Sequence, residues 1–150
     1  MEGVSDVLRR ARVEDLPLMW RGEAAYMKQV EPEHEAGWVA AADRNLAGWI
    51  AGLERTLILE ADGEPAGYAA WAVTDGRAVL TTIHVFAAFR RRGRGGALLQ
   101  AYVNDARTFG HKALALAVLR GNPAETLYVR HGFEHTHDQG QYKHYALTLT

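Results

Sequence analysis

The chain has 150 residues, 48% hydrophobic and 23% charged, so it is expected to fold as a single domain spanning residues 1–150. Seventeen lysines and arginines against eighteen aspartates and glutamates give a formal net charge of −1, which argues against binding nucleic acid or an anionic membrane through overall charge. The absence of cysteine excludes disulfides, thiolate catalysis and thiolate metal sites, and it fits a cytoplasmic protein.

The first half of the chain predicts one strand, two helices and then three strands. The first thirty residues contain five acidic side chains and no long apolar stretch, so they predict neither a signal nor a transit peptide. A short strand is expected at 7–11, and apolar residues at helical spacing predict helices over 15–26 and 33–53. Three strands at 56–61, 67–73 and 78–86, separated by Asp-Gly turns, predict an antiparallel meander.

The second half predicts a strand between two helices, followed by two closing strands. Helix 95–109 stops at Gly110, and the apolar strand 112–119 reads as buried on both faces. A short helix over 122–130 has Asn122 at its N-cap and Glu125 three residues later, a variant of the capping box. The predicted class is α/β (α+β): a mixed, mostly antiparallel sheet of about seven strands with four helices and one parallel crossover between the fourth and fifth strands.

A turn rich in glycine and arginine is predicted between the fourth strand and the next helix. Such a turn directs backbone N–H groups at one point beside the positive end of the helix dipole, and its glycines let an anion approach the main chain. The arginines suit a pyrophosphate. The sequence therefore predicts a phosphate site, with a solvated basic loop as the alternative, over Arg90, Arg91, Arg92, Gly93, Arg94, Gly95 and Gly96.

The spacing excludes two common phosphate-binding loops. A Walker A loop ends in Gly-Lys-Ser/Thr, where this chain has Gly95-Gly96-Ala97. A dinucleotide fingerprint needs a glycine three residues after its second, where this chain has Leu98. Nucleic-acid binding through the arginines would need a broad basic surface, which the net charge of −1 argues against.

Two motifs resemble those of the GNAT-type N-acetyltransferases. One is similar to that family's acetyl-coenzyme A signature, an Arg-x-x-Gly-x-Gly turn after a strand, here Arg90, Gly93 and Gly95 after Val85. The other is similar to its downstream landmark, here Asn122, Tyr128, Gly132 and Phe133. The order of predicted elements resembles the family over the whole chain. The resemblance implies a GNAT-like acyl-CoA N-acyltransferase fold, in which the fourth and fifth strands splay apart.

The resemblance also implies where acetyl-CoA binds. In that family the pantetheine arm lies between the splayed strands, and a backbone N–H polarises the thioester carbonyl. Those main-chain contacts would come from Ile83, His84 and Val85. Asn122 would contact the arm as well as capping its helix. The backbone N–H groups of residues 91–96 in the arginine-glycine turn would hold the pyrophosphate, and arginine side chains would reach the adenosine 3′-phosphate.

Tyr128 matches the family's tyrosine near the departing sulfur. A phenol, with an ordinary pKa near 10, is protonated at neutral pH and can give a proton to a thiolate. The alternative is a core tyrosine that packs the short helix against the sheet.

The general base is where the sequence departs from the resemblance. Many relatives carry a carboxylate on the fourth strand, where this chain has Thr81. His84, with an ordinary pKa near 6.5, is the nearest titratable group and the candidate base, although strand alternation puts it on the face opposite Ile83 and Val85. His84→Ala is then expected to lower the rate mainly below pH 7. The alternatives are a water relay or an amine that arrives neutral.

Four of the seven histidines lie late in the chain, at His131, His135, His137 and His144. His135 and His137 would share a strand face, but no carboxylate or cysteine completes a ligand set, so polar surface is preferred and no metal is expected. In similar enzymes the first two helices and the last strands line the acceptor pocket. The candidates there are Trp20, Tyr26, His34, Trp38, Tyr142 and Tyr145, with core packing as the alternative for the tryptophans.

These features predict an N-acetyltransferase that passes an acetyl group from acetyl-CoA directly to a primary amine of a small molecule or protein, in a ternary complex. The absence of cysteine agrees with a route that has no acetyl-enzyme. The alternative is a non-catalytic acyl-CoA-binding sensor or scaffold of the same fold. Dimers occur in the family, but no residue here requires one. A composition without acidic excess does not favour a strongly cationic acceptor.

Overall fold

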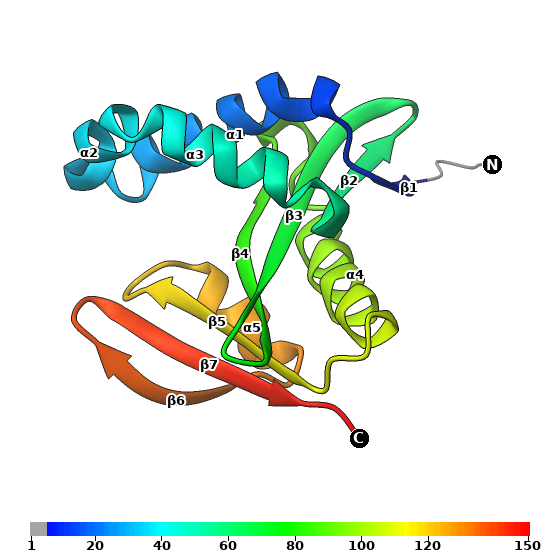
Figure 1. The fold of residues 1–150 in the computed structure, drawn as a ribbon, viewed down its shortest axis with the longest axis vertical. Helices are drawn as coiled ribbons and strands as arrows, with labels where there is room; N and C mark the ends of the chain where they lie inside the picture. Colours follow the sequence, from blue (N-terminus) through cyan, green and yellow to red (C-terminus); the bar gives the residue numbers. More distant parts are fainter. Residues whose placement is uncertain (1–5) are drawn as a thin grey trace.

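Seven strands form one sheet with the order β1-β2-β3-β4-β5-β7-β6 (Figure 1). The computed structural model describes residues 6–150. The strands are β1 (Asp6–Arg10), β2 (Thr56–Ala61), β3 (Glu64–Thr74), β4 (Arg77–Val85), β5 (Ala113–Leu119), β6 (Glu134–Gln139) and β7 (Tyr142–Thr148). All paired neighbours are antiparallel except β4 and β5, which are parallel, so the predicted fold class and crossover are confirmed.

The helices differ from the prediction at one point. They are α1 (Leu16–Gln29), α2 (Glu35–Ala40), α3 (Ala42–Ala51), α4 (Arg94–Thr108) and α5 (Ala124–Arg130). The single helix predicted over 33–53 is interrupted at Ala41, where the backbone leaves the helical region at φ −94° and ψ 17°. The Asn45 side-chain amide donates to the Trp38 carbonyl there, a local bond that competes with the helical ladder. The apolar stripe continues across the break, so periodicity alone does not reveal it.

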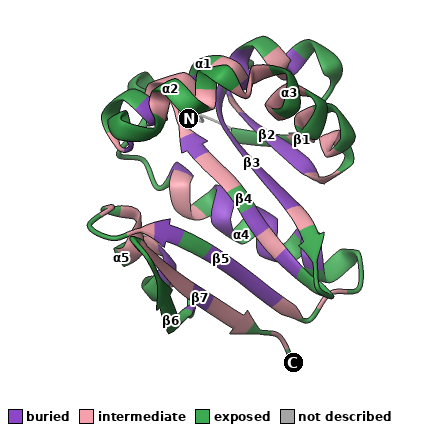
Figure 2. Ribbon diagram, turned by 60° about the vertical axis from the view of Figure 1, so that its left-hand side comes forward, coloured by how far each residue is buried: buried purple, intermediate pink, exposed green. Residues whose placement is uncertain are grey.

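The helices divide between the two faces of the sheet. Buried side chains of α4 pack with β3, β4 and β5 in the larger core, which also takes in Tyr128 and Phe133. A smaller core joins α1 to β2 and β3 on the opposite face, around Met19, Ile58 and Tyr68. Figure 2 shows α1, α2 and α3 together at one end of the sheet and β5, β6 and β7 at the other, with β4 between them. Within residues 6–150, no helix has the length and apolarity needed to cross a membrane.

Strands β4 and β5 are paired over only two residues each. Ala78 lies opposite Leu114 and Val79 opposite Ala115, after which the strands diverge. Beyond Val79, no strand within residues 6–150 pairs with the edge of β4 that faces β5. The predicted splay is therefore confirmed, and it opens the sheet between these strands (Figure 1).

A β-bulge at Thr81 reverses the alternation of side chains along β4. Leu80 pairs with Trp71 and Thr82 with Ala70, so Thr81 is the extra residue of the pair. Leu80 and Ile83, three residues apart, consequently both pack into the core beneath α4. Thr82 therefore faces α1.

The approach of α1 to β3 depends on a glycine. Tyr68 on β3 is fully buried. Its hydroxyl points toward α1 and lies within hydrogen-bond distance of the Met19 carbonyl and the Glu23 carboxylate. A Cβ at Gly22 would clash with the Tyr68 hydroxyl and ring. Gly22 therefore allows α1 to lie close enough to the sheet for Glu23 to reach Tyr68.

Alanine substitutions at two helical glycines are expected to have opposite effects on stability. Gly22→Ala should lower the free energy of unfolding by about 1–3 kcal/mol, because the methyl group overpacks the contact with Tyr68. Gly48→Ala should raise it by roughly 0.5–1 kcal/mol, because α3 gains helix propensity and a Cβ there meets no atom within 4 Å. Urea unfolding of both variants measures the pair, and a stabilised Gly22→Ala would contradict the close approach.

Candidate functional site

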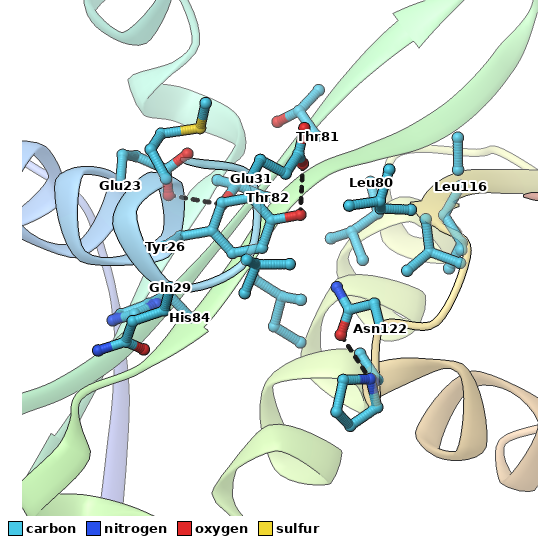
Figure 3. Close-up of a pocket in the computed structure, with 18 of the residues that line it drawn as sticks. Glu23, Tyr26, Gln29, Glu31, Leu80, Thr81, Thr82, His84, Leu116 and Asn122 are labelled. Atoms are coloured by element: carbon cyan, nitrogen blue, oxygen red, sulfur yellow. Dashed lines mark hydrogen bonds between the residues drawn. The ribbon is translucent and has the colours of Figure 1, made fainter. Parts of the chain in front are cut away.

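A cavity of about 690 Å³ lies where β4 and β5 separate and extends to the C-terminal part of α1 (Figure 3). Its walls come from four parts of the chain. They are α1 and the segment after it (Glu23, Tyr26, Glu31 and Trp38), β4 with the following turn (residues 80–85 and 90), β5 (residues 116–119), and the α5 and β7 region (Asn122, Pro123, Ala124, Tyr128 and Tyr142).

The structure brings six of the predicted site residues to this one cavity. They are Ile83, His84, Val85, Arg90, Asn122 and Tyr128. The other predicted residues of the arginine-glycine turn, residues 91–96, lie at the start of α4 outside the cavity lining. The cavity therefore extends from Arg90 in the turn, along β4, to Tyr128 on α5.

The start of α4 has the geometry of an anion site. Ala97 donates the first helical bond, to the Gly93 carbonyl, so the preceding amides of Arg94, Gly95 and Gly96 have no helical acceptor. Gly93 and Arg91 both adopt the left-handed conformation, with φ of +73° and +70°. These amides and the helix dipole could together hold a phosphate, so the pyrophosphate site stays a prediction that this geometry favours.

The Arg94 side chain, however, already bonds to other parts of the fold. It is buried, it donates from Nε to Asp6 at 2.9 Å and from Nη1 to the Phe89 carbonyl at 3.0 Å, and its guanidinium lies 5.7 Å from the centre of the Phe89 ring. Arg94 is therefore not one of the arginine side chains that can reach a phosphate while these contacts hold. Arg91 and Arg92 are exposed and fit the predicted contact with a phosphate.

Asn122 caps its helix as expected and keeps a donor for the second role predicted for it. Its Oδ1 accepts a hydrogen bond from the Ala124 N–H at 2.9 Å, which caps α5. Glu125 reaches back to the Gly121 N–H at 3.1 Å, one residue further than the capping box requires. Because the cap occupies only the oxygen, the Nδ2 group of Asn122 is left as a donor at the cavity wall (Figure 3).

Tyr128 lines the cavity with a protonated hydroxyl. The residue is only 5% exposed, and its ring packs against Phe133 and Tyr145. Burial raises the pKa of Tyr128 to about 12. Among residues 6–150 the hydroxyl makes no hydrogen bond of its own, so it is free to donate to a group bound in the cavity.

Glu23 lines the cavity and is not among the residues predicted from the sequence. Its Oε2 accepts hydrogen bonds from Tyr68 at 2.6 Å and Thr82 at 2.7 Å, and the carboxylate lies on the cavity wall beside β4 (Figure 3). Burial raises its pKa, although the two hydroxyl donors oppose that effect, and the charge of Glu31 raises it further. No donor from residues 6–150 bonds Oε1, so a carboxylate with an increased affinity for protons has one oxygen free.

One signal in the sequence does mark Glu23. It lies four residues after Met19 and four before Met27, both of which are buried, so it interrupts the apolar stripe of α1 with a charged side chain. A carboxylate on a buried helix face needs a polar partner, and Thr82 and Tyr68 provide it here.

His84 is unsuited to the role of base that the sequence assigned to it. It does lie on the face opposite Ile83 and Val85, as expected, where its ring packs between Tyr68 and Phe86. Burial, together with the positive charge of Arg90, lowers its pKa to about 4. Because this pKa lies well below the ordinary value near 6.5, the structure argues against His84 as the base and against an effect of His84→Ala mainly below pH 7.

We expect His84→Asn to leave the shape of the activity profile unchanged between about pH 6 and pH 8, because the ring stays neutral there. The pH dependence of the free energy of unfolding should change instead. The unfolded histidine binds a proton below about pH 6.5 and the folded one only near 4, so lowering the pH between these values destabilises the wild type by up to about 1.4 kcal/mol per unit. Urea unfolding should show a shallower pH dependence in the variant. An activity limb near pH 6.5 that disappears with the substitution would contradict this.

The late histidines do not form the pair that their spacing suggests. A bulge at Thr136 puts His135 opposite Tyr145 and His137 opposite His144, which are successive residues on β7. His135 and His137 therefore point to opposite faces, and the shared face expected of them is wrong. Within the described part of the chain, no three His, Asp or Glu side chains are grouped as metal ligands.

Three of the aromatic acceptor candidates line the cavity, namely Tyr26, Trp38 and Tyr142. Trp20 is not in the lining, but it stacks on Trp38 with ring centres 4.3 Å apart and so helps to hold the Trp38 ring in place. Tyr145 is buried beside Tyr128, and its hydroxyl donates to Glu125 instead. His34 and Tyr145 are not part of the lining.

The chain matches the sequence model of the acetyltransferase (GNAT) family over residues 6–133. No curated protein matches it significantly in sequence. Among solved structures it is similar to PaiA N-acetyltransferase from Thermoplasma acidophilum in complex with coenzyme A, with a TM-score of 0.81 and 17% identity, over 96% of this chain and 99% of that one. It is also similar to the ribosomal-protein-S18-alanine N-acetyltransferase from Escherichia coli, with a TM-score of 0.68 and 23% identity, over 97% of this chain and 95% of that one.

The structural likeness, at these low identities, concerns the fold. The sequence match independently covers the splayed strands, the arginine-glycine turn and the helix that carries Tyr128. On both grounds, the chain belongs to the acetyltransferase (GNAT) family.

Proposed function

We propose that the protein transfers the acetyl group of acetyl-CoA directly to a primary amine. The observation that carries this proposal is the pairing of two proton-transfer groups across one cavity, with the Glu23 carboxylate beside β4 and the Tyr128 hydroxyl on α5. Similar structures include one with coenzyme A bound and others named as N-acetyltransferases, which supports the choice of cosubstrate and acceptor.

Acetyl-CoA fits the binding groups that lie one after another from the start of α4 to α5. The amides at the start of α4, with Arg91 and Arg92, would hold its phosphates. The pantetheine arm would lie between β4 and β5, along the edge of β4 beyond Val79 and within reach of Asn122. A β4 backbone N–H would then polarise the thioester carbonyl.

The chemistry removes two protons from the acceptor ammonium and gives one to sulfur. Oε1 of Glu23 takes the first proton, and the neutral nitrogen then forms a bond to the carbonyl carbon of the thioester. The nitrogen gives its second proton to water as the tetrahedral intermediate forms. As the C–S bond breaks, the Tyr128 hydroxyl gives its proton to the departing thiolate. Proton exchange with water returns both side chains to their starting states. Because the nitrogen attacks the acetyl carbon itself, no acetyl-enzyme is required.

The release of free thiol from acetyl-CoA, measured across a panel of primary amines, tests the proposal. We expect turnover that depends on the amine and yields the N-acetyl product by mass spectrometry. Tight binding of acetyl-CoA without turnover on any amine would instead support a non-catalytic acyl-CoA sensor and contradict the proposal.

A further inference from the structure

Glu31 is a buried carboxylate that pairs with no basic side chain of residues 6–150. The residue is 8% exposed and lines the cavity. Its two oxygens accept hydrogen bonds from the hydroxyls of Tyr26 and Tyr142, each at 2.6 Å. Burial and Glu31 itself raise the pKa of both tyrosines, so they remain neutral donors. Within residues 6–150, Glu31 forms no ion pair, and such an uncompensated buried charge is costly.

Glu23 adds a second carboxylate to the same cavity (Figure 3). The two charges affect one another, since Glu31 is among the causes that raise the pKa of Glu23. The basic side chains of the lining are His84, which is neutral above pH 4, and Arg90, which donates to the Val85 carbonyl at the α4 end of β4. The α1 side of the cavity is therefore negative, although the chain as a whole is close to neutral.

Three aromatic side chains also line this negative end of the cavity. Trp38 is one of them and stacks on Trp20. The other two are Tyr26 and Tyr142, whose hydroxyls bond to Glu31. A carboxylate surrounded by aromatic rings favours an ammonium group on an aliphatic chain. The carboxylate pairs with the positive charge, and the rings attract both the ammonium and the methylene groups next to it.

We propose that the acceptor is a small aliphatic diamine, in which one amino group reacts at Glu23 while the second, as an ammonium, binds Glu31. This inference rests on the proposed function and identifies the substrate class. Glu31 then determines specificity and takes no part in proton transfer. The near-neutral composition did not favour such an acceptor, but the charge that matters is local to the cavity.

A set of amines with one chain length and three different ends tests this. They are 1,4-diaminobutane, 1-aminopentane and 5-aminopentanoic acid, which end in an ammonium, a methyl and a carboxylate. We expect the wild-type kcat/KM to be roughly 10- to 100-fold higher for the diamine than for the other two, the range expected of one hydrogen-bonded charge pair. Equal values, or a preference for the carboxylate end, would overturn the inference. The latter would point to a neighbouring cavity of about 370 Å³, which Arg44 and Arg55 border.

Glu31→Gln separates specificity from a structural role. We expect it to raise KM for the diamine roughly 10- to 100-fold and to lower kcat/KM for 1-aminopentane by a much smaller factor. Glu33→Gln, at an exposed neighbour, should change neither. An equal loss on both amines, as when Tyr26 and Tyr142 merely lose their acceptor, would overturn the assignment, as would turnover of a lysyl peptide without turnover of the diamine.

Failure of this inference differs from failure of the proposed function. Turnover on all three amines without preference would overturn only the inference that the acceptor is a diamine. No turnover on any amine, with acetyl-CoA bound, would overturn both that inference and the proposed function. A wild-type preference for the diamine stands independently of whether Glu31→Gln folds, and binding of 1,4-diaminobutane to the coenzyme A complex should raise the melting temperature of the wild type more than 1-aminopentane does.

Discussion

Glu23→Gln should lower kcat for amine acetylation by roughly 10²- to 10⁴-fold at neutral pH, the usual contribution of a positioned general base. Glutamine keeps an oxygen that can accept the hydrogen bonds of Tyr68 and Thr82, so the fold of the site is retained while the basic group is lost. Binding of acetyl-CoA should change by no more than about twofold. The residual activity should rise with pH, since only the unprotonated amine can react without a base. Stopped-flow and steady-state assays across pH measure both effects.

Thr82→Val provides the matched control for this substitution. It removes a donor that lowers the pKa of Glu23 and leaves the carboxylate in place. The acidic limb of the kcat/KM profile should therefore move to higher pH, with little loss of rate above it. If Glu23→Gln retained a rate within threefold of the wild type, Glu23 would not be the base.

Tyr128→Phe is expected to reduce kcat by roughly 10²-fold, because the departing thiolate loses its proton donor. The phenyl ring preserves the packing against Phe133, so stability and the KM for acetyl-CoA should change little. With the pKa of Tyr128 at about 12, the wild-type hydroxyl stays protonated across the accessible range, and no basic limb from Tyr128 should appear below about pH 10. Steady-state kinetics over pH 6 to 10 tests both statements.

Tyr145→Phe is the control for a merely structural tyrosine. Tyr145 is buried against Tyr128, but its hydroxyl donates to Glu125 and not into the cavity. We expect kcat to stay within about threefold of the wild type. Losses of similar size in Tyr128→Phe and Tyr145→Phe would indicate that Tyr128 acts through packing and not as an acid.

The parts of the site that are continuous in sequence could be predicted from it. The strand ending at Val85, the arginine-glycine turn and the start of α4 follow one another, so β-propensity, glycine and helix periodicity locate them directly. The cap at Asn122 is similarly local. Each of these features depends on neighbours within a few residues.

The proposed base, Glu23, could not be predicted in this way because its position depends on tertiary packing. Glu23 and Thr82 are 59 residues apart and meet because Gly22 lets α1 lie close to Tyr68 and the bulge at Thr81 turns Thr82 toward α1. A period-2 pattern cannot show where such a bulge occurs. The same limitation explains His84, whose chemical type suits a base but whose burial lowers its pKa to about 4.

Initial velocities measured with acetyl-CoA varied at several fixed concentrations of 1,4-diaminobutane test direct transfer most directly. If both substrates must occupy the cavity between β4 and β5 together, the reciprocal plots should intersect, and the product should be the N-acetyl amine. Parallel plots, or acetyl-CoA consumption that does not depend on the amine, would contradict direct transfer from the thioester to the acceptor.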